Sequence, residues 1–290
     1  MSGARLVART VRGIEHLVAA EIRELGLGRV DRLAHREVWF SCPEVGPAVL
    51  GLSCADDVFL VGATVDGVGR GRSDLRLLAE AAGAVAVRPE AGVRTLDVSA
   101  SFLGRRNYNR YDVEDAVGEQ LAAVAGLRYR GRRDGEVPPP GGMSWRVTIA
   151  DDQAAIALRL ASRPLHRRAY RRVTRPGSLH PPVAAAMVRL AGPGQRLLDP
   201  FCGSGTIPIE ASMAGRDVVG SDVDLAAARA NGPGLDWVLA DAGRLPFRTG
   251  GIDLVVGNPP WERQVSAAGV LATRPELFWR ELRRVLRPGG

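Results

Sequence analysis

The sequence predicts an α/β protein whose C-terminal part is a Rossmann-like, doubly wound parallel sheet preceded by an α+β region. Three observations predict it. Strand and helix patterns alternate from residue 196 onward, a Gly-x-Gly turn follows the first of these strands, and polar residues follow four of them. A chain of 290 residues is long enough for two or three domains.

The individual elements follow from hydrophobic periodicity and from glycine, proline and aspartate stops. In the C-terminal part, strands are predicted at 196–201, 217–221, 236–240 and 252–257, and helices at 183–190, 206–214, 224–231 and 275–286. Upstream, strands are predicted at 4–11, 30–33, 37–41, 58–64, 95–101, 145–149 and 154–160. Helices are predicted there at 14–25, 45–52, 73–82 (with Ser73 as N-cap) and 112–125.

Basic charge is concentrated in the front of the chain. All 39 basic residues are arginine. Residues 1–182 contain 27 arginines and 21 acidic residues, whereas residues 183–290 contain 12 arginines and 11 acidic residues. This excess favours a polyanion-binding front half, although a solvated basic surface would have the same composition. Three cysteines without a C-x-x-C pair, and no apolar signal or membrane segment, predict a cytoplasmic chain with no metal and no membrane partner.

Four predicted strands of the C-terminal part each end in a polar residue. These residues are Asp199, Asp222, Asp241 and Asn258. Because the carboxyl ends of parallel strands line one crevice, we expect them to lie together. An acid after the second strand is placed to accept from a ribose diol, and one after the third from an adenine amino group. With the glycine turn, they predict a nucleoside cofactor.

The segment Asn258-Pro259-Pro260-Trp261 is the second chemical signal. Two prolines stiffen the backbone and remove two N–H donors, which leaves carbonyls and the Asn amide oxygen as fixed acceptors. Two acceptors suit the two hydrogens of an amino group, and Trp261 offers a flat face for a base. Holding an sp² amine with its lone pair toward a methyl carbon would aid transfer by orientation and charge stabilisation. A rigid loop with a packed Trp is the alternative.

Two arginine-rich stretches are candidate RNA contacts, with an exposed loop and a solvated linker as the alternatives. The first interleaves Arg with Tyr and Asn, and its candidates are Arg105, Arg106, Tyr108 and Arg110. The second, Arg159 to Arg175, has seven arginines and no acid, and its candidates are Arg167, Arg168, Arg171 and Arg172.

These motifs carry a resemblance to class I S-adenosylmethionine-dependent methyltransferases, and the whole chain resembles the THUMP-domain RNA guanine-N2 methyltransferases. The start at Thr10–Glu15, the stretches Arg105–Val117 and Trp145–Arg172, and Asp199–Thr206 carry it. The resemblance implies S-adenosylmethionine as cofactor and Asn258, Pro259, Pro260 and Trp261 as the catalytic segment. The cofactor residues it implies are Asp199, Phe201, Gly203, Ser204, Gly205, Thr206, Asp222 and Asp241.

The resemblance also implies a domain plan and a substrate. The plan is a ferredoxin-like unit at 1–52, a THUMP-type RNA-binding domain at 53–163, a basic linker at 164–182 and a methyltransferase domain at 183–290. The implied activity is methylation of guanine N2 in structured RNA, tRNA before 23S rRNA. The alternatives are an amino methyltransferase acting on DNA adenine or protein glutamine, and a catalytically impaired RNA-binding protein.

One departure from the family pattern concerns the sheet. Family members have seven strands, whereas four are predicted here before Gly290. The strand 252–257 would then lie at an open edge, which proteins normally protect. The expectation is therefore a truncated chain, or a sheet that a second polypeptide completes.

Overall fold

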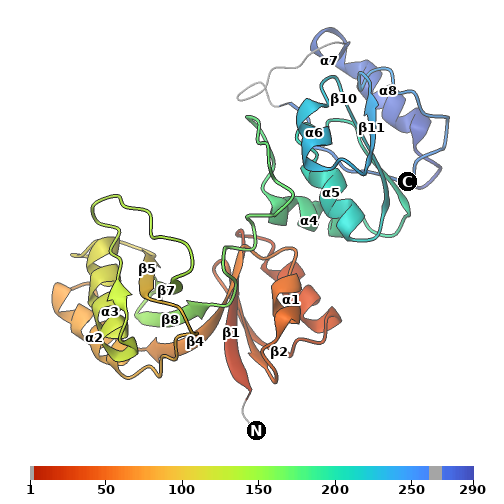
Figure 1. Ribbon diagram of the computed structural model, residues 1–290. Coiled ribbons are helices and arrows are strands. Elements are labelled where there is room, and N and C mark those ends of the chain that lie inside the picture. Colours follow the sequence, from red (N-terminus) through yellow and green to blue (C-terminus); the bar gives the residue numbers. More distant parts are fainter. Residues whose placement is uncertain (1–2, 261–269) are drawn as a thin grey trace. The chain divides into compact units, whose positions relative to one another are not determined.

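The computed structural model describes residues 3–260 and 270–290 (Figure 1). The chain forms two compact units. Residues up to Leu165 make up the first, except for Val11–Glu21 and Ser53–Ala55, which belong with His166–Gly290 in the second. The helix α1 (Glu15–Glu24) spans one of these junctions.

The first unit is built on an eight-stranded sheet in the order β2-β3-β1-β4-β8-β7-β5-β6. Its strands are β1 (Ala4–Arg9), β2 (Arg29–Ala34), β3 (Glu37–Cys42), β4 (Asp57–Val65), β5 (Thr95–Phe102), β6 (Arg128–Tyr129), β7 (Met143–Ala150) and β8 (Gln153–Arg159). One sheet thus runs through both predicted N-terminal domains. The division of the chain into four domains stays a prediction.

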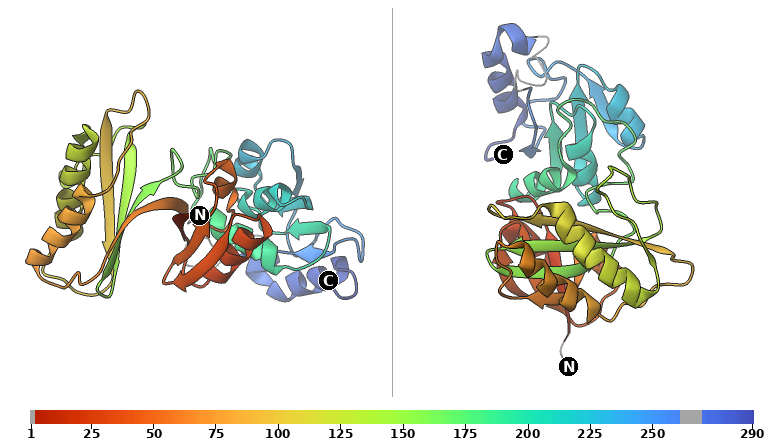
Figure 2. Two further views of the ribbon diagram at one scale, coloured as in Figure 1. Left: turned by 90° about the horizontal axis from the view of Figure 1, so that it is seen from below. Right: turned by 90° about the vertical axis from the view of Figure 1, so that its left-hand side faces the viewer.

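Two helices cover one face of this sheet, α2 (Leu75–Gly83) and α3 (Arg110–Ala125). Figure 2 shows them side by side along the strands. Side chains alternate between the faces of a strand, so Val98 of β5 and Val147 of β7 point toward the helices and pack with Leu78 and Leu121. Ser99, which follows Val98 in β5, and Arg146, which precedes Val147 in β7, therefore belong to the other face of the sheet.

The second unit contains a parallel sheet in the order β11-β10-β9-β12. Its elements are α4 (Pro181–Leu190), β9 (Arg196–Asp199), α5 (Thr206–Met213), β10 (Asp217–Asp222), α6 (Ala226–Asn231), β11 (Asp236–Leu239), β12 (Leu254–Val255), α7 (Val270–Thr273) and α8 (Pro275–Val285). Leu198 in β9 lies beside Val219 of β10 and Val255 of β12. This register brings the carboxyl ends of the strands to one edge and confirms the Rossmann-like α/β fold.

Several element boundaries differ from the predictions. The expected helix 45–52 is a 3₁₀ helix at Pro47–Gly51. A 3₁₀ turn at Arg72–Asp74 precedes α2, so Asp74 takes the N-cap position predicted for Ser73. The expected strand 252–257 pairs only over Leu254–Val255, at one end of the sheet that the described residues form, and Ile252 makes an isolated bridge to Leu286. Among the described helices, none has the length and hydropathy to cross a membrane.

Candidate active site

A pocket of about 810 Å³ lies at the carboxyl ends of the parallel strands, entirely within the second unit. All four predicted strand-end residues line it, since Asp199, Asp222, Asp241 and Asn258 each follow or end a strand that reaches this edge. Further lining residues from the motifs are Phe201, Gly203, Ser204, Thr206, Pro259 and Pro260. The structure therefore brings the predicted cofactor residues, except Gly205, together with Asn258, Pro259 and Pro260 of the predicted catalytic segment.

The glycine turn needs glycine for two physical reasons. Gly203 and Gly205 have φ angles of 53° and 82°, which L side chains rarely adopt. At Gly205 a Cβ atom would also lie 2.8 Å from the Trp237 ring. The Gly203 N–H donates to Asp222 Oδ2 at 2.8 Å, so the predicted ribose acid also braces the turn.

Asp199 is a buried acid in the lining of this pocket, with 1% of its surface exposed. Its Oδ1 accepts from the Phe201 N–H at 3.0 Å. Burial, with a smaller contribution from the charge of Asp222, raises the pKa of Asp199 to about 8. S-adenosylmethionine carries a sulfonium and an ammonium group, so two neighbouring carboxyl groups in a pocket suit it. The donor set fits this cofactor.

The pocket also has a wall that the sequence motifs did not predict. Arg175 to His180 of the basic linker line it, and the Ser204 hydroxyl of the glycine turn donates to the Ser178 hydroxyl at 3.0 Å. The Asn231 amide fixes this linker, because its Nδ2 donates to Val173 O and Ser204 O at 2.8 Å, and its Oδ1 accepts from the Arg172 and Val173 N–H groups at 2.9 Å. Asn231 is 5% exposed on α6. Nothing in the local sequence distinguishes it from a helix-ending Asn.

The catalytic segment is described as far as Pro260. Asn258 Nδ2 lies 3.4 Å from Gly177 O, so the amide is turned toward the linker wall, and Pro259 and Pro260 line the pocket with it. Trp261, predicted to stack on the base, lies outside the described residues.

The predicted RNA contacts of the linker separate into two groups. Arg167 and Arg172 are exposed, and Arg171 is half-buried. Arg168 faces inward: its guanidinium pairs with Glu210 at 2.8 Å, with exposed side-chain fractions of 11% and 1%, and donates to Ser53 O at 2.6 Å. A buried ion pair occupies Arg168, so the expectation that it contacts RNA is wrong.

The predicted Arg/Tyr loop separates in the same way. Arg105 and Arg110 are exposed. Tyr108 is 4% exposed and packs in the core beneath α3, and its hydroxyl donates to Gly69 O at 3.0 Å. Arg106 donates to the carbonyls of Val68, Gly69 and Asp151. Arg106 and Tyr108 therefore hold the loop, and the expected stacking role of Tyr108 is wrong because its ring is buried.

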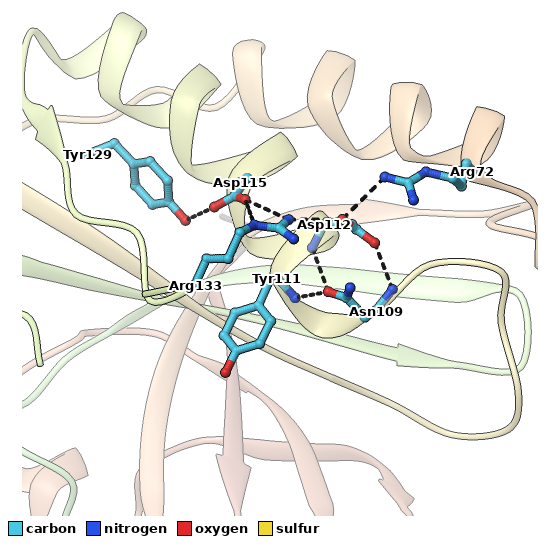
Figure 3. Close-up of polar contacts among 7 residues, drawn as sticks. All are labelled: Arg72, Asn109, Tyr111, Asp112, Asp115, Tyr129 and Arg133. Atoms are coloured by element: carbon cyan, nitrogen blue, oxygen red, sulfur yellow. Dashed lines mark hydrogen bonds and ion pairs between the residues drawn. The ribbon is translucent and has the colours of Figure 1, made fainter. Parts of the chain in front are cut away.

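The aromatic ring of this region that reaches solvent is the half-buried Tyr111, three residues further along. Figure 3 shows it pointing away from the polar network at the start of α3, where Asn109 Oδ1 caps the helix by accepting from the N–H groups of Tyr111 and Asp112. The guanidinium carbons of Arg110 and Arg133 lie 4.6 and 5.8 Å from its ring centre. The sequence did not single out Arg133, which is 22 positions from Tyr111 in the chain and meets it only through folding.

The parallel sheet, its glycine turn and the acids at its strand ends define a class I methyltransferase that uses S-adenosylmethionine. Comparisons with known proteins agree. Residues 168–231 match the family model described as an RMKL-like methyltransferase domain. The chain is 32% identical to the tRNA (guanine(6)-N2)-methyltransferase of Thermus thermophilus, over 98% of this chain and 87% of that protein. The chain therefore belongs to the same methyltransferase family as that enzyme.

Solved structures support this assignment. The crystal structure of TrmN from Thermus thermophilus superposes with a TM-score of 0.79 at 30% identity, covering 99% of this chain and 86% of that one. A putative methyltransferase in complex with SAH, SMU.472, shares the fold at 20% identity, with a TM-score of 0.69 over 97% of this chain and 85% of that one. A ribosomal RNA large subunit methyltransferase K/L from Photobacterium profundum is 30% identical to this chain. The matched region covers 73% of this chain and 30% of that protein.

Proposed function

We propose that this protein transfers a methyl group from S-adenosylmethionine to N2 of a guanine in tRNA. The observation that carries the proposal is one pocket lined both by the rigid Asn258-Pro259-Pro260 segment and by the acids Asp199, Asp222 and Asp241. Similarity to a tRNA guanine-N2 methyltransferase over nearly the whole chain supports tRNA as substrate. Guanine at position 6 is the first candidate.

One set of pocket residues binds the cofactor, and another set binds the target amine. Asp199 and Asp222, with the turn from Phe201 to Thr206, bind the cofactor, and Asp241 accepts from its adenine; bound there, the cofactor supplies an electrophilic methyl carbon. Asn258 Oδ1 and the Pro259 carbonyl accept the two N2 hydrogens and aim the nitrogen lone pair. Held in this way, N2 would present its lone pair to the methyl group that the bound cofactor would supply. The proton of N2 leaves to water.

RNA contacts are proposed at arginines that reach solvent on both units: Arg105 in the loop before α3, Arg110 at the first residue of α3, and Arg167, Arg171 and Arg172 on the linker. Residues 53–163 form the proposed RNA-binding domain. A 23S rRNA substrate is the second candidate, because the K/L relative, named for ribosomal RNA, matches 73% of this chain.

The test is methyl transfer by the Asn258→Ala variant. With tRNA transcripts and labelled cofactor, kcat should fall by on the order of 10²–10³, as expected when a group that stabilises transition-state charge is removed. Binding of SAH should persist. Gln120→Ala, which removes an exposed carboxamide on α3, is the matched control and should retain full activity.

Substrate variants test the acceptor atom and the RNA class. A transcript with inosine in place of the target guanosine lacks N2 and should accept no methyl group. A 23S rRNA fragment should react far more slowly than tRNA. Full activity of Asn258→Ala, or methylation of the inosine transcript, would contradict the proposed site.

A further inference from the structure

The face of the first unit's sheet that points away from α2 and α3 carries a cluster of arginines. Arg9 of β1, Arg146 of β7 and Arg159 of β8 belong to this face, since the strand neighbours of Arg146, Trp145 and Val147, pack under the helices. Hydroxyl groups of Ser99, Ser101 and Thr148 lie among these arginines. We call these six residues the arginine cluster.

The three arginines have different partners. Arg9 pairs with Glu37 at 2.9 Å, and Arg159 pairs with Asp57 at 2.7 Å. Arg146 instead donates to the Ser101 hydroxyl at 2.6 Å and only weakly, at 3.5 Å, to that of Ser99. Across the described residues, no carboxylate lies within ion-pair distance of Arg146. Three cations thus meet two carboxylates, and the excess positive charge lies on Arg146.

This excess charge is unfavourable in the structure as it stands. Burial, and next the charge of Arg9, lower the pKa of Arg146 to about 10, so the side chain stays charged at neutral pH while it is poorly solvated. Its Nε is buried without a hydrogen-bond partner. Serine hydroxyls do not neutralise a guanidinium, and an anion would. The arrangement is that of an anion site: a planar fork of donors beside hydroxyls that can rotate to donate.

Positive charge continues along the same face. Trp39 of β3 lies beside Val7 of β1, which shares this face with Arg9. The guanidinium carbons of Arg32 and Arg5 lie 4.5 and 5.5 Å from the Trp39 ring centre, and both arginines are exposed. A line of cations across several strands matches the repeated charges of a nucleic-acid backbone better than a single small anion.

We infer that the arginine cluster binds a backbone phosphate of the substrate RNA, with Arg146 as its central ligand and Arg9, Ser101 and Thr148 as flanking donors. The inference rests on the proposed function, since it takes tRNA as the source of the phosphate. Apart from Arg159, the residues of this contact surface lie outside the two arginine-rich stretches found in the sequence. The contact is to phosphate, so it contributes affinity and orientation without reading base sequence.

The test compares the salt dependence of tRNA binding by the full-length protein and by Arg146→Gln, without cofactor. Losing one phosphate contact should make the slope of log K against log salt shallower by about 0.7–0.9 and should weaken binding at low salt by about tenfold. Arg76→Gln is the matched control: it removes the same charge from an exposed position on α2, over the other face, and should leave the slope unchanged. A wild-type slope and affinity for Arg146→Gln would overturn the inference.

Two further measurements separate the remaining explanations. Arg146→Lys keeps the charge and loses the planar guanidinium, so a folded Arg146→Lys variant should keep the slope of log K against log salt and bind tRNA a few-fold more weakly. An affinity equal to wild type would count against a bidentate contact.

Inorganic phosphate should compete with tRNA for binding to the wild type, and it should compete less for binding to Arg146→Gln. Phosphate binding that Arg146→Gln abolishes, with an unchanged tRNA slope, would assign the site to free phosphate and overturn the RNA assignment. A wild-type protein that binds tRNA without methylating it would contradict the proposed function alone.

Discussion

Replacing the buried acid Asp199 by asparagine should change how stability depends on pH. In the folded protein, burial holds the pKa of Asp199 at about 8, whereas an unfolded Asp titrates at about 3.9. Between these values unfolding releases a proton, so the free energy of unfolding falls as pH rises, by about 1.4 kcal/mol per unit. From pH 5 to pH 8 this amounts to about 4 kcal/mol. The introduced carboxamide would have no proton to release, and its oxygen can still accept from the Phe201 N–H.

The assay is urea unfolding of wild type and Asp199→Asn at half-unit steps from about pH 4.5 to about pH 8.5, without cofactor, which covers most of the interval between the two pKa values and passes the folded-state value. The two proteins should have similar stability at the acidic end, and the variant should become progressively more stable as pH rises, levelling off above the folded-state pKa. Asp236→Asn, at an exposed position on β11, is the control for a carboxylate-to-amide change and should show no such trend. A constant difference between wild type and Asp199→Asn across this range would refute the argument.

Two other substitutions test packing and positioning. Asn231→Asp loses the two donors to Val173 O and Ser204 O, so the linker wall should loosen and the KM for S-adenosylmethionine should rise about tenfold, measured by initial rates at saturating tRNA. Gly118→Ala places a Cβ 2.2 Å from the Tyr129 ring and should cost about 1–3 kcal/mol in urea unfolding, whereas at Gly83 the nearest atom would be 3.7 Å away and the same change should cost far less.

The sequence predicted the pocket well because parallel topology determines it. Once strands alternate with helices, the ends of 196–199 and 217–222 must reach the same edge, and Asp199 and Asp222 meet there whatever the details of the loops. Element ends were less predictable, because Ser73 and Asp74 are both good capping residues and a single 3₁₀ turn decides between them. The pocket wall at 175–180 was missed, since no motif marks it.

Composition could not separate the arginine and tyrosine residues that hold the structure from those that face solvent. Tyr108 and Tyr111 are three positions apart in the chain. Tyr108 is buried because it precedes the Asn109 cap and turns under α3, whereas Tyr111 lies half-exposed in the first turn of the helix. Arg146 was overlooked for the opposite reason. It is the one arginine of β7, and the other arginines of its cluster, Arg9 and Arg159, are each more than ten positions away from it in the chain.

The linker shows why its arginines should differ in function. Arg168 forms an ion pair with Glu210 on α5. The backbone N–H groups of Arg172 and Val173 donate to the Asn231 side chain on α6, and the Asn231 amide also donates to Ser204 O in the glycine turn. Removing Glu210 would take away the carboxylate that pairs with the buried Arg168, a change that costs about 3–5 kcal/mol when a buried ion pair is broken. Such a change should disturb the cofactor pocket first. Arg167 and the Arg172 side chain are exposed on the same linker, so an RNA that contacts them would bind to a segment whose position the cofactor turn already sets.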